Sequence, residues 1–328
     1  MLERRSDCPH RHVPPVVLLC AVLAGGLLPG CDRRQPGAET RILTDGLGRT
    51  VRLPPRPRRI VSLAPSVTSS LLALGARDRL VGVTDFCVLP AGDAPVARIG
   101  GMLNPSLETI RGLGPDVLVA TTSGNDPSLA REAASIGLPL YTIHTPDVES
   151  VLRSLLDLGR LIDEPERGRV LVADLRSRLS TVASGIALDR PVRVLFVVWG
   201  DPLVVPGRSS FLTDALARAG GTSITSDAAA AYPTFDVESA IMRAPEAILT
   251  TQQNRAVLDR LRAEPAWSRV PAVRSGRLFV VSESIEQPGP EVVSGIEEVA
   301  RRLHPRVFAA PGAAASPAPR REGRRVSP

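Results

Sequence analysis

Short apolar segments alternate with helical patterns along most of this chain. The apolar runs of the first half lie at 60–63, 80–83, 117–120 and 140–143, and helical patterns lie between them at 66–74, 106–112 and 126–136. Strands this apolar, each followed by a helix, indicate a parallel sheet that is covered on both faces. A turn between 42–43 and 51–53 predicts a hairpin before the first of these strands.

The alternation is interrupted once. Two helical patterns, Val148 to Ile162 and Glu166 to Ile186, follow one another with no apolar run between them. Strand patterns then resume at 194–198, 247–250 and 278–281, with helical patterns at 210–218, 236–243 and 291–303. Because 328 residues are too many for one compact core, we predict an α/β fold. It consists of two Rossmann-like lobes with parallel sheets, joined by one long rigid α-helix, with a ligand cleft between the lobes.

One stretch of the first half is echoed in the second at an offset of 130 residues. Ser106 matches Asp236, and both residue types cap helices. Glu108 matches Glu238, and each copy continues through a proline turn and an acidic residue into an apolar strand. The match is short, but it indicates two related lobes, which place a ligand at the carboxyl ends of their strands.

The N-terminus is typical of a bacterial lipoprotein signal. Arg4, Arg5 and Arg11 precede an apolar run that is too short to span a bilayer, and the run ends in Leu-Pro-Gly before Cys31. We expect lipidation of Cys31, although an ordinary signal peptide or a buried helix would also account for the run. The exported chain would then keep only Cys87, so no internal disulfide is expected.

These patterns predict the following division of the chain. We expect a signal peptide at 1–30, a tether at 31–43, an N-terminal lobe at 44–163, a connecting helix at 164–187, a C-terminal lobe at 188–305 and a disordered basic tail at 306–328. The net charge of +6 comes largely from the two ends, and the segment between them carries about +1. A nearly neutral body gives no indication of nucleic-acid binding.

No catalytic motif is found in the sequence. The nucleophile elbow, the phosphate-binding loop and the dinucleotide fingerprint are all missing, so we expect no enzymatic activity. After signal removal only His144 and His304 remain, which is too few imidazoles for a bare zinc or manganese site. We expect no resident metal or cofactor. His144 could ligate haem iron or a corrin metal, but a structural role at its strand end is favoured.

Several further motifs are family markers. They include Asp45-x-x-Gly-Arg-x-Val-x-Leu-Pro, Arg59-Ile-Val-Ser-Leu-Ala-Pro-Ser66, Asn104-Pro-Ser-Leu-Glu108, Pro115-Asp-Val-Leu-Val, Trp199-Gly200, Gly220-Gly221 and Tyr232-Pro233. Together they resemble the substrate-binding proteins of ABC importers for cobalamin and iron siderophores, the class III receptors with a helical backbone. The resemblance runs from about Thr44 to His304.

The resemblance implies a role in import. Such a protein would be exported and lipid-anchored at Cys31, on the periplasmic side of the inner membrane or, without an outer membrane, on the cell surface. It would act as a monomer, capture a metal chelate, and deliver it to an ABC permease dimer with its ATPase subunits. In this family a glutamate on each lobe docks into arginines of the permease, and the matching residues here are Glu108 and Glu238. Without the resemblance, each would be an ordinary first-turn glutamate.

Ligand contacts are expected from the strand ends and the loops after them. The candidates are Ser66, Phe86, Met102, Leu103, Thr122, Trp199, Arg208, Tyr232 and Phe235. Aromatic faces suit a corrin ring or a chelate rim, although core packing is an equal possibility for each of them. Few arginines occur in these loops, which favours cobalamin or a neutral hydroxamate chelate over a trianionic catecholate. A haem receptor, a non-transport sensor of the same fold and an α/β enzyme are the alternatives.

Overall fold

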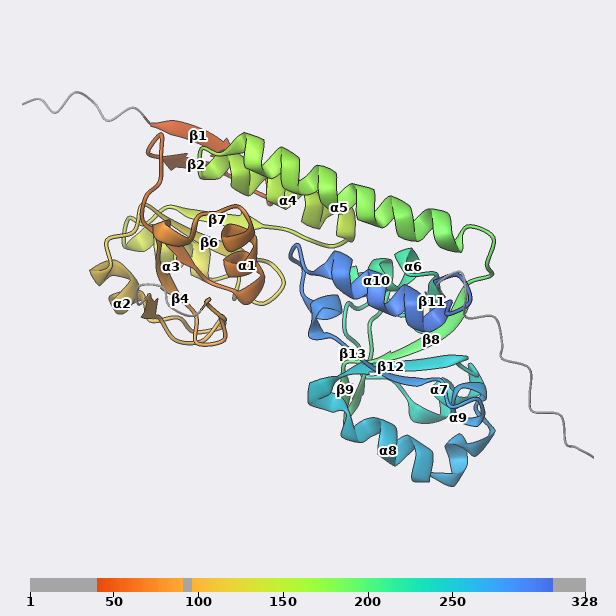
Figure 1. Cartoon of the computed structure of the whole chain (residues 1–328). Coiled ribbons are helices and arrows are strands. Elements are labelled where there is room, and N and C mark those ends of the chain that lie inside the picture. Colours follow the sequence, from red (N-terminus) through yellow and green to blue (C-terminus); the bar gives the residue numbers. More distant parts are fainter. Residues whose placement is uncertain (1–39, 91–95, 309–328) are drawn as a thin grey trace, which may run out of the picture. The chain divides into compact units, whose positions relative to one another are not determined.

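A five-stranded parallel sheet forms the centre of the first lobe (Figure 1). The structure is a computed structural model that describes residues 40–90 and 96–308. The strand order is β5-β4-β3-β6-β7, and every pairing in it is parallel. The strands are β3 (Ile60–Ser62), β4 (Leu80–Val83), β5 (Ala97–Arg98), β6 (Val117–Thr121) and β7 (Leu140–Ile143). The strand β3, which comes first in the sequence among the five, therefore lies in the middle of the sheet, where all three of its residues are buried.

Helices cover both faces of this sheet. They are α1 (Pro65–Ala73), α2 (Leu107–Gly112) and α3 (Leu129–Ser135). Ile60 faces a core cluster that contains Leu71 of α1. The next residue, Val61, faces a different cluster with Ile110 of α2. Because successive side chains of a strand point to opposite faces, a strand between two helical layers must be apolar throughout.

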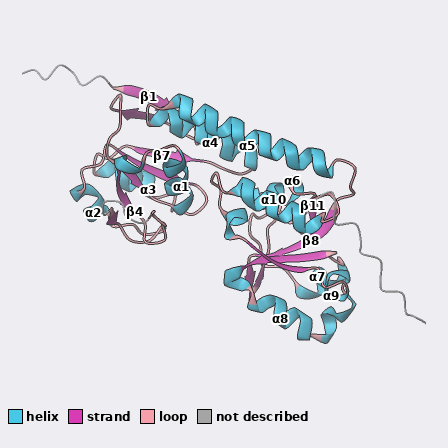
Figure 2. Ribbon diagram, viewed as in Figure 1, coloured by secondary structure: helices cyan, strands magenta, loops and turns pink. Residues whose placement is uncertain are grey.

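The second lobe repeats this arrangement around a four-stranded parallel sheet with the order β11-β8-β12-β13. Its strands are β8 (Val192–Val197), β11 (Gly221–Ser223), β12 (Ala247–Thr251) and β13 (Leu278–Val281). Its helices are α6 (Phe211–Arg218), α7 (Val237–Met242), α8 (Ala256–Ala263), α9 (Pro271–Arg274) and α10 (Val292–Leu303). Phe196 of β8 packs with residues of α6 and α10, whereas its neighbour Val197 packs with α8 and Trp267. Figure 2 shows helices flanking these strands.

Short elements complete the two lobes. The hairpin of β1 (Arg41–Thr44) and β2 (Thr50–Leu53) precedes the first sheet, and β9 (Trp199–Gly200) pairs with β10 (Leu203–Val204) in the second lobe. Single 3-10 turns lie at Arg77–Arg79, Gln252–Asn254, Pro265–Arg269 and Glu283–Glu286. The predicted α/β fold with two parallel sheets is confirmed. The strands β5, β9, β10 and β11 were not predicted, because two or three residues carry no period that a sequence can reveal.

Two long helices lie side by side (Figure 1). They are α4 (Val148–Leu161) and α5 (Pro165–Ile186), and in the sequence they follow the last strand of the first sheet and precede the first strand of the second. Their backbones meet at two glycines, since a Cβ added to Gly159 would lie 3.2 Å from the Cα of Gly168. The start of α4 belongs to the second-lobe core through Val148, and its end belongs to the first-lobe core through Leu161. These two helices match the two consecutive helical patterns that the sequence predicts at 148–162 and 166–186, and α5 corresponds to the predicted connecting helix.

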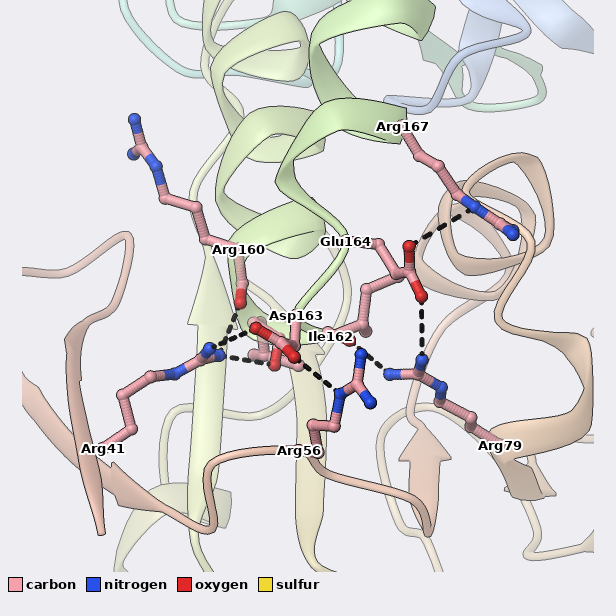
Figure 3. Close-up of polar contacts among 9 residues, drawn as sticks. Arg41, Arg56, Arg79, Arg160, Ile162, Asp163, Glu164 and Arg167 are labelled. Atoms are coloured by element: carbon pink, nitrogen blue, oxygen red, sulfur yellow. Dashed lines mark hydrogen bonds and ion pairs between the residues drawn. The ribbon is translucent and has the colours of Figure 1, made fainter. Parts of the chain in front are cut away.

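The turn between α4 and α5 is held by arginines from the first lobe (Figure 3). Asp163 has a φ of 59°, and its carboxylate accepts from Arg56 at 2.6 Å and from Arg41 at 3.5 Å. Glu164 accepts from Arg79 at 3.3 Å. Exposed ion pairs contribute little each, so the main effect of this cluster is to position three separate segments of the first lobe, at Arg41, Arg56 and Arg79, against the helix turn.

The predicted signal peptide, Cys31, residues 32–39 of the tether and residues 309–328 of the tail lie outside the described residues. Within residues 40–90 and 96–308, no helix combines the length and apolar character that crossing a bilayer requires.

Candidate functional site

A cavity of about 560 Å³ lies at the carboxyl ends of strands from both lobes. The first lobe contributes Thr122, Ser123 and Gly124 after β6, and His144, Thr145 and Pro146 after β7. The second lobe contributes Ser209, Ser210, Phe211, Ala231, Tyr232, Glu286 and Pro288. Its volume falls within the range of small-molecule sites. Larger ligands would extend beyond it into solvent.

His144 is the ionisable group that the first lobe brings to this cavity. It directly follows β7, and its Nδ1 lies 2.9 Å from the hydroxyl oxygen of Thr122, which follows the neighbouring strand β6. The ring is exposed, and its Nε2 has no hydrogen-bond partner among the described residues. A ring held through one nitrogen leaves the other free for a ligand.

The β1–β2 turn braces the backbone that carries His144. The amide of Gly46 donates to the carbonyl of Thr142 at 2.8 Å, and a Cβ on Gly46 would lie 2.6 Å from the amide nitrogen of His144. Asp45 is 5% exposed, and its carboxylate accepts a hydrogen bond from the guanidinium of Arg49. The same guanidinium donates to the Thr142 hydroxyl at 2.7 Å. The turn sequence Asp-Gly-Leu-Gly-Arg at 45–49 therefore supports the end of β7.

Tyr232 and Glu286 are the ionisable groups on the second-lobe wall. Desolvation raises the pKa of the Tyr232 phenol, although 45% of the side chain remains exposed. Desolvation also raises the pKa of Glu286 to about 6, and the negative charge of Glu283 adds to this effect. The hydroxyl of Thr251 lowers this pKa in part, but its Oγ1 makes no hydrogen bond of regular geometry.

Direct contacts join the two lobes outside the cavity lining. The Ser69 hydroxyl of α1 donates to the Glu291 carboxylate at 3.0 Å. Gly289 packs closely against the same helix, since an added Cβ would lie 2.9 Å from the Ser69 hydroxyl oxygen and 3.4 Å from the carbonyl oxygen of Ser66. The segment that follows Glu286 is thereby fixed next to the first lobe.

Two of the nine predicted ligand residues, Thr122 and Tyr232, line the cavity. Met102 lies at its border, because its terminal methyl group packs against Gly124. Phe86 and Leu103 are 67% and 70% exposed but do not line it. A ligand role for all five of these residues stays a prediction.

The other four candidates are held elsewhere. Trp199 is 54% exposed, and its indole donates to the carbonyl of Asp201 at 2.9 Å. Phe235 packs against a core cluster of the second lobe, and Arg208 donates to the carbonyl of Asp227. Ser66 is buried in α1 and is 6% exposed. None of the four lines the cavity of about 560 Å³, so their role too stays a prediction.

The sequence contains no indication of Glu286, and for His144 it favours a structural role over a role as metal ligand. His144 stood at a strand end, which was a usable signal. Glu286 lies in a 3-10 turn after β13, where only the fold shows that the side chain reaches the cavity.

The predicted docking glutamates lie away from this cavity. Glu108 and Glu238 are exposed in the first turns of α2 and α7. The acidic residue after each helix makes the same kind of hydrogen bond in both lobes. The Asp116 carboxylate accepts from the backbone amide of Arg59 at 2.9 Å, and the Glu246 carboxylate accepts from the backbone amide of Arg193 at 3.1 Å. The structure thus confirms that the sequence echo marks equivalent positions.

Comparisons with known proteins agree with this architecture. A vitamin B12-binding protein of Vibrio cholerae serotype O1 is 24% identical over 246 residues, which cover 75% of this chain and 88% of that protein. An uncharacterised ABC transporter substrate-binding lipoprotein of Bacillus subtilis is 26% identical over 306 residues, covering 89% and 96%. The crystal structure of a periplasmic haem-binding protein from Pseudomonas aeruginosa superposes with a TM-score of 0.67 at 26% identity, covering 76% and 93%.

Residues 60–284 match the family model described as periplasmic binding protein. The matched range contains both sheets, the α4–α5 pair and nearly all of the cavity lining. Relatives and matching structures alike are substrate-binding proteins rather than enzymes. This chain belongs to the periplasmic binding protein family of the ABC transporter type.

Proposed function

We propose that this protein is the substrate-binding lipoprotein of an ABC importer, which captures cobalamin or an iron chelate and delivers it to the permease. The observation that carries the proposal is the cavity of about 560 Å³, whose walls come from the strand ends of both lobes. Strand ends at the junction of two α/β units are the usual ligand sites of such folds. The named relatives that bind vitamin B12 support cobalamin as the first ligand to test.

Docking on the permease is proposed for Glu108 and Glu238. Both carboxylates are exposed and lie in equivalent first turns, so two equivalent cationic pockets could receive them. We also propose lipid attachment at Cys31, periplasmic or cell-surface location, and a monomeric receptor. The relative described as a lipoprotein supports the anchor.

A haem receptor is the second candidate. His144 and Tyr232 line the same cavity from different lobes, and imidazole and phenolate are both axial ligands of haem iron. The likeness to a haem-binding protein of Pseudomonas aeruginosa supports this alternative. A corrinoid and a porphyrin are both flat metal macrocycles, so the choice between them depends on the groups at their rims.

Calorimetric titration of the purified chain with cyanocobalamin, haemin and a ferric hydroxamate tests the proposal. We expect submicromolar binding of one of the three with a stoichiometry of one, within the affinity range of specific small-molecule sites. Loss of that binding in Tyr232→Ala, with an unchanged unfolding midpoint, would locate the ligand in the cavity. Failure of all three ligands to bind the wild type would contradict the proposed function.

A further inference from the structure

We infer that Glu286 sets the charge selectivity of the cavity, so that it favours a chelate with amide N–H donors at its rim and disfavours one with carboxylates. This inference rests on the proposed function and names the class of chelate that the same site would accept. It assigns a specificity role to a residue that no sequence motif indicates.

The composition of the cavity wall is the first step. Among the thirteen lining residues that the structure describes, Glu286 is the only carboxylate, and none is arginine or lysine. Within the described part of the chain Glu286 also has no ion-pair partner, whereas the nearby Glu291 is hydrogen-bonded by Ser69. An anionic rim group would therefore meet a negative charge and no compensating cation.

The surroundings of Glu286 define its charge. Glu283 lies on the same 3-10 turn, Tyr232 lies on the adjacent loop, Thr251 ends strand β12, and His144 lies on the opposite wall. Partial burial and Glu283 raise its pKa to about 6, so the carboxyl group is mostly ionised at neutral pH. In a site with reduced access to water, charges act more strongly than they do on an open surface.

The candidate ligands differ at the rim. Cyanocobalamin carries primary amides, whose N–H groups can donate charge-assisted hydrogen bonds to a carboxylate. Haemin carries two propionates, which a nearby carboxylate repels. A ferric catecholate carries three negative charges and would be disfavoured most strongly. The wall chemistry therefore favours an amide-bearing corrinoid or a neutral hydroxamate.

The test compares the dissociation constants of cyanocobalamin and haemin for the full chain and three variants at pH 7.5. Glu286→Gln keeps the shape of the side chain and removes its charge. We expect it to bind haemin about tenfold more tightly and cyanocobalamin several-fold more weakly, because a charge-assisted hydrogen bond becomes a neutral one. Glu286→Asp keeps the charge and should retain most of the wild-type preference.

Glu283→Gln is the matched control, since it removes a carboxylate from the same turn but outside the cavity lining. Its ratio of the two dissociation constants should stay within about twofold of the wild type. If the wild type binds a ligand and Glu286→Gln leaves the ratio unchanged, the selectivity role is wrong and the proposed function stands. If the wild type binds none of cyanocobalamin, haemin and the ferric hydroxamate, both are wrong.

Discussion

Glu108 and Glu238 occupy the same position in the two lobes, each as the second residue of a six-residue helix. The residue before each helix caps it: the Ser106 hydroxyl accepts from the amide of Thr109 at 3.2 Å, and the Asp236 carboxylate accepts from the amide of Ser239 at 2.6 Å. Each helix leads into a strand that pairs with the first parallel strand of its lobe. The two carboxylates are therefore equivalent by fold and not by sequence alone.

Replacing both glutamates tests docking. Glu108→Ala with Glu238→Ala should lower ligand uptake by about tenfold or more, because charge pairs across an interface set orientation and association rate. The affinity for ligand in solution should stay near the wild-type value, since neither residue lines the cavity. Glu166→Ala is the control, as it removes another exposed first-turn glutamate. Unchanged uptake in the double variant would refute the docking role.

Gly46→Ala should weaken ligand binding through the backbone of His144. Its Cβ would lie 2.6 Å from the His144 nitrogen and 2.9 Å from the Thr142 oxygen, so the β1–β2 turn must move away from β7. We expect a loss of about 1–3 kcal/mol in the free energy of unfolding. Urea unfolding and ligand titration measure the two effects.

Gly112→Ala is the matched control for Gly46→Ala. It adds the same methyl group where no atom lies within 4 Å, at the end of helix α2. It should be neutral or stabilise the protein by up to about 1 kcal/mol, because alanine lowers the entropy of the unfolded chain. Equal losses in both variants would contradict the bracing role of the turn.

Gly168→Val should destabilise the α4–α5 pair. A Cβ at this position already lies 3.2 Å from the Leu155 carbonyl oxygen, and valine adds two further methyl groups to that contact. Overpacking of this kind costs about 1–3 kcal/mol in the free energy of unfolding. Ala173→Val places the same side chain on an exposed position of α5 and should cost well under about 1 kcal/mol. Similar unfolding midpoints for the two variants would show that the helices do not depend on this close approach.

Glu286 should make the stability of the unliganded protein depend on pH. Its pKa rises from 4.5 to about 6 on folding, so the folded state binds the proton more tightly than the unfolded state. This tighter proton binding adds to the free energy of unfolding below pH 4.5, and the added stability is lost as the pH rises through 6. The Glu286→Gln variant has no titrating group at this position and does not lose this stability. Its free energy of unfolding relative to that of the wild type should therefore increase by up to about 2 kcal/mol between pH 4 and pH 7.5. Urea unfolding at several pH values measures the difference, and parallel profiles would contradict it.

The alternation of apolar runs with helical patterns was sufficient to predict both parallel sheets, since strands covered on both faces must be apolar at every position. The echo around Glu108 and Glu238 was equally visible, because a cap, a short helix and a proline turn are local features. Local signals failed for the strands of only two or three residues at 97–98, 199–200, 203–204 and 221–223, because so few residues leave no period to detect.

The sequence by itself thus determined the class of fold, the repeated lobe and the family to which the chain belongs. Only the tertiary structure decided which side chains meet. His144, Tyr232 and Glu286 come from three separate loops, and no pattern within any of those loops indicates that they share one cavity. The α4–α5 pair likewise depends on two glycines that face each other across the helices. Such contacts arise from packing between distant segments, whereas periodicity reports only how each segment is buried.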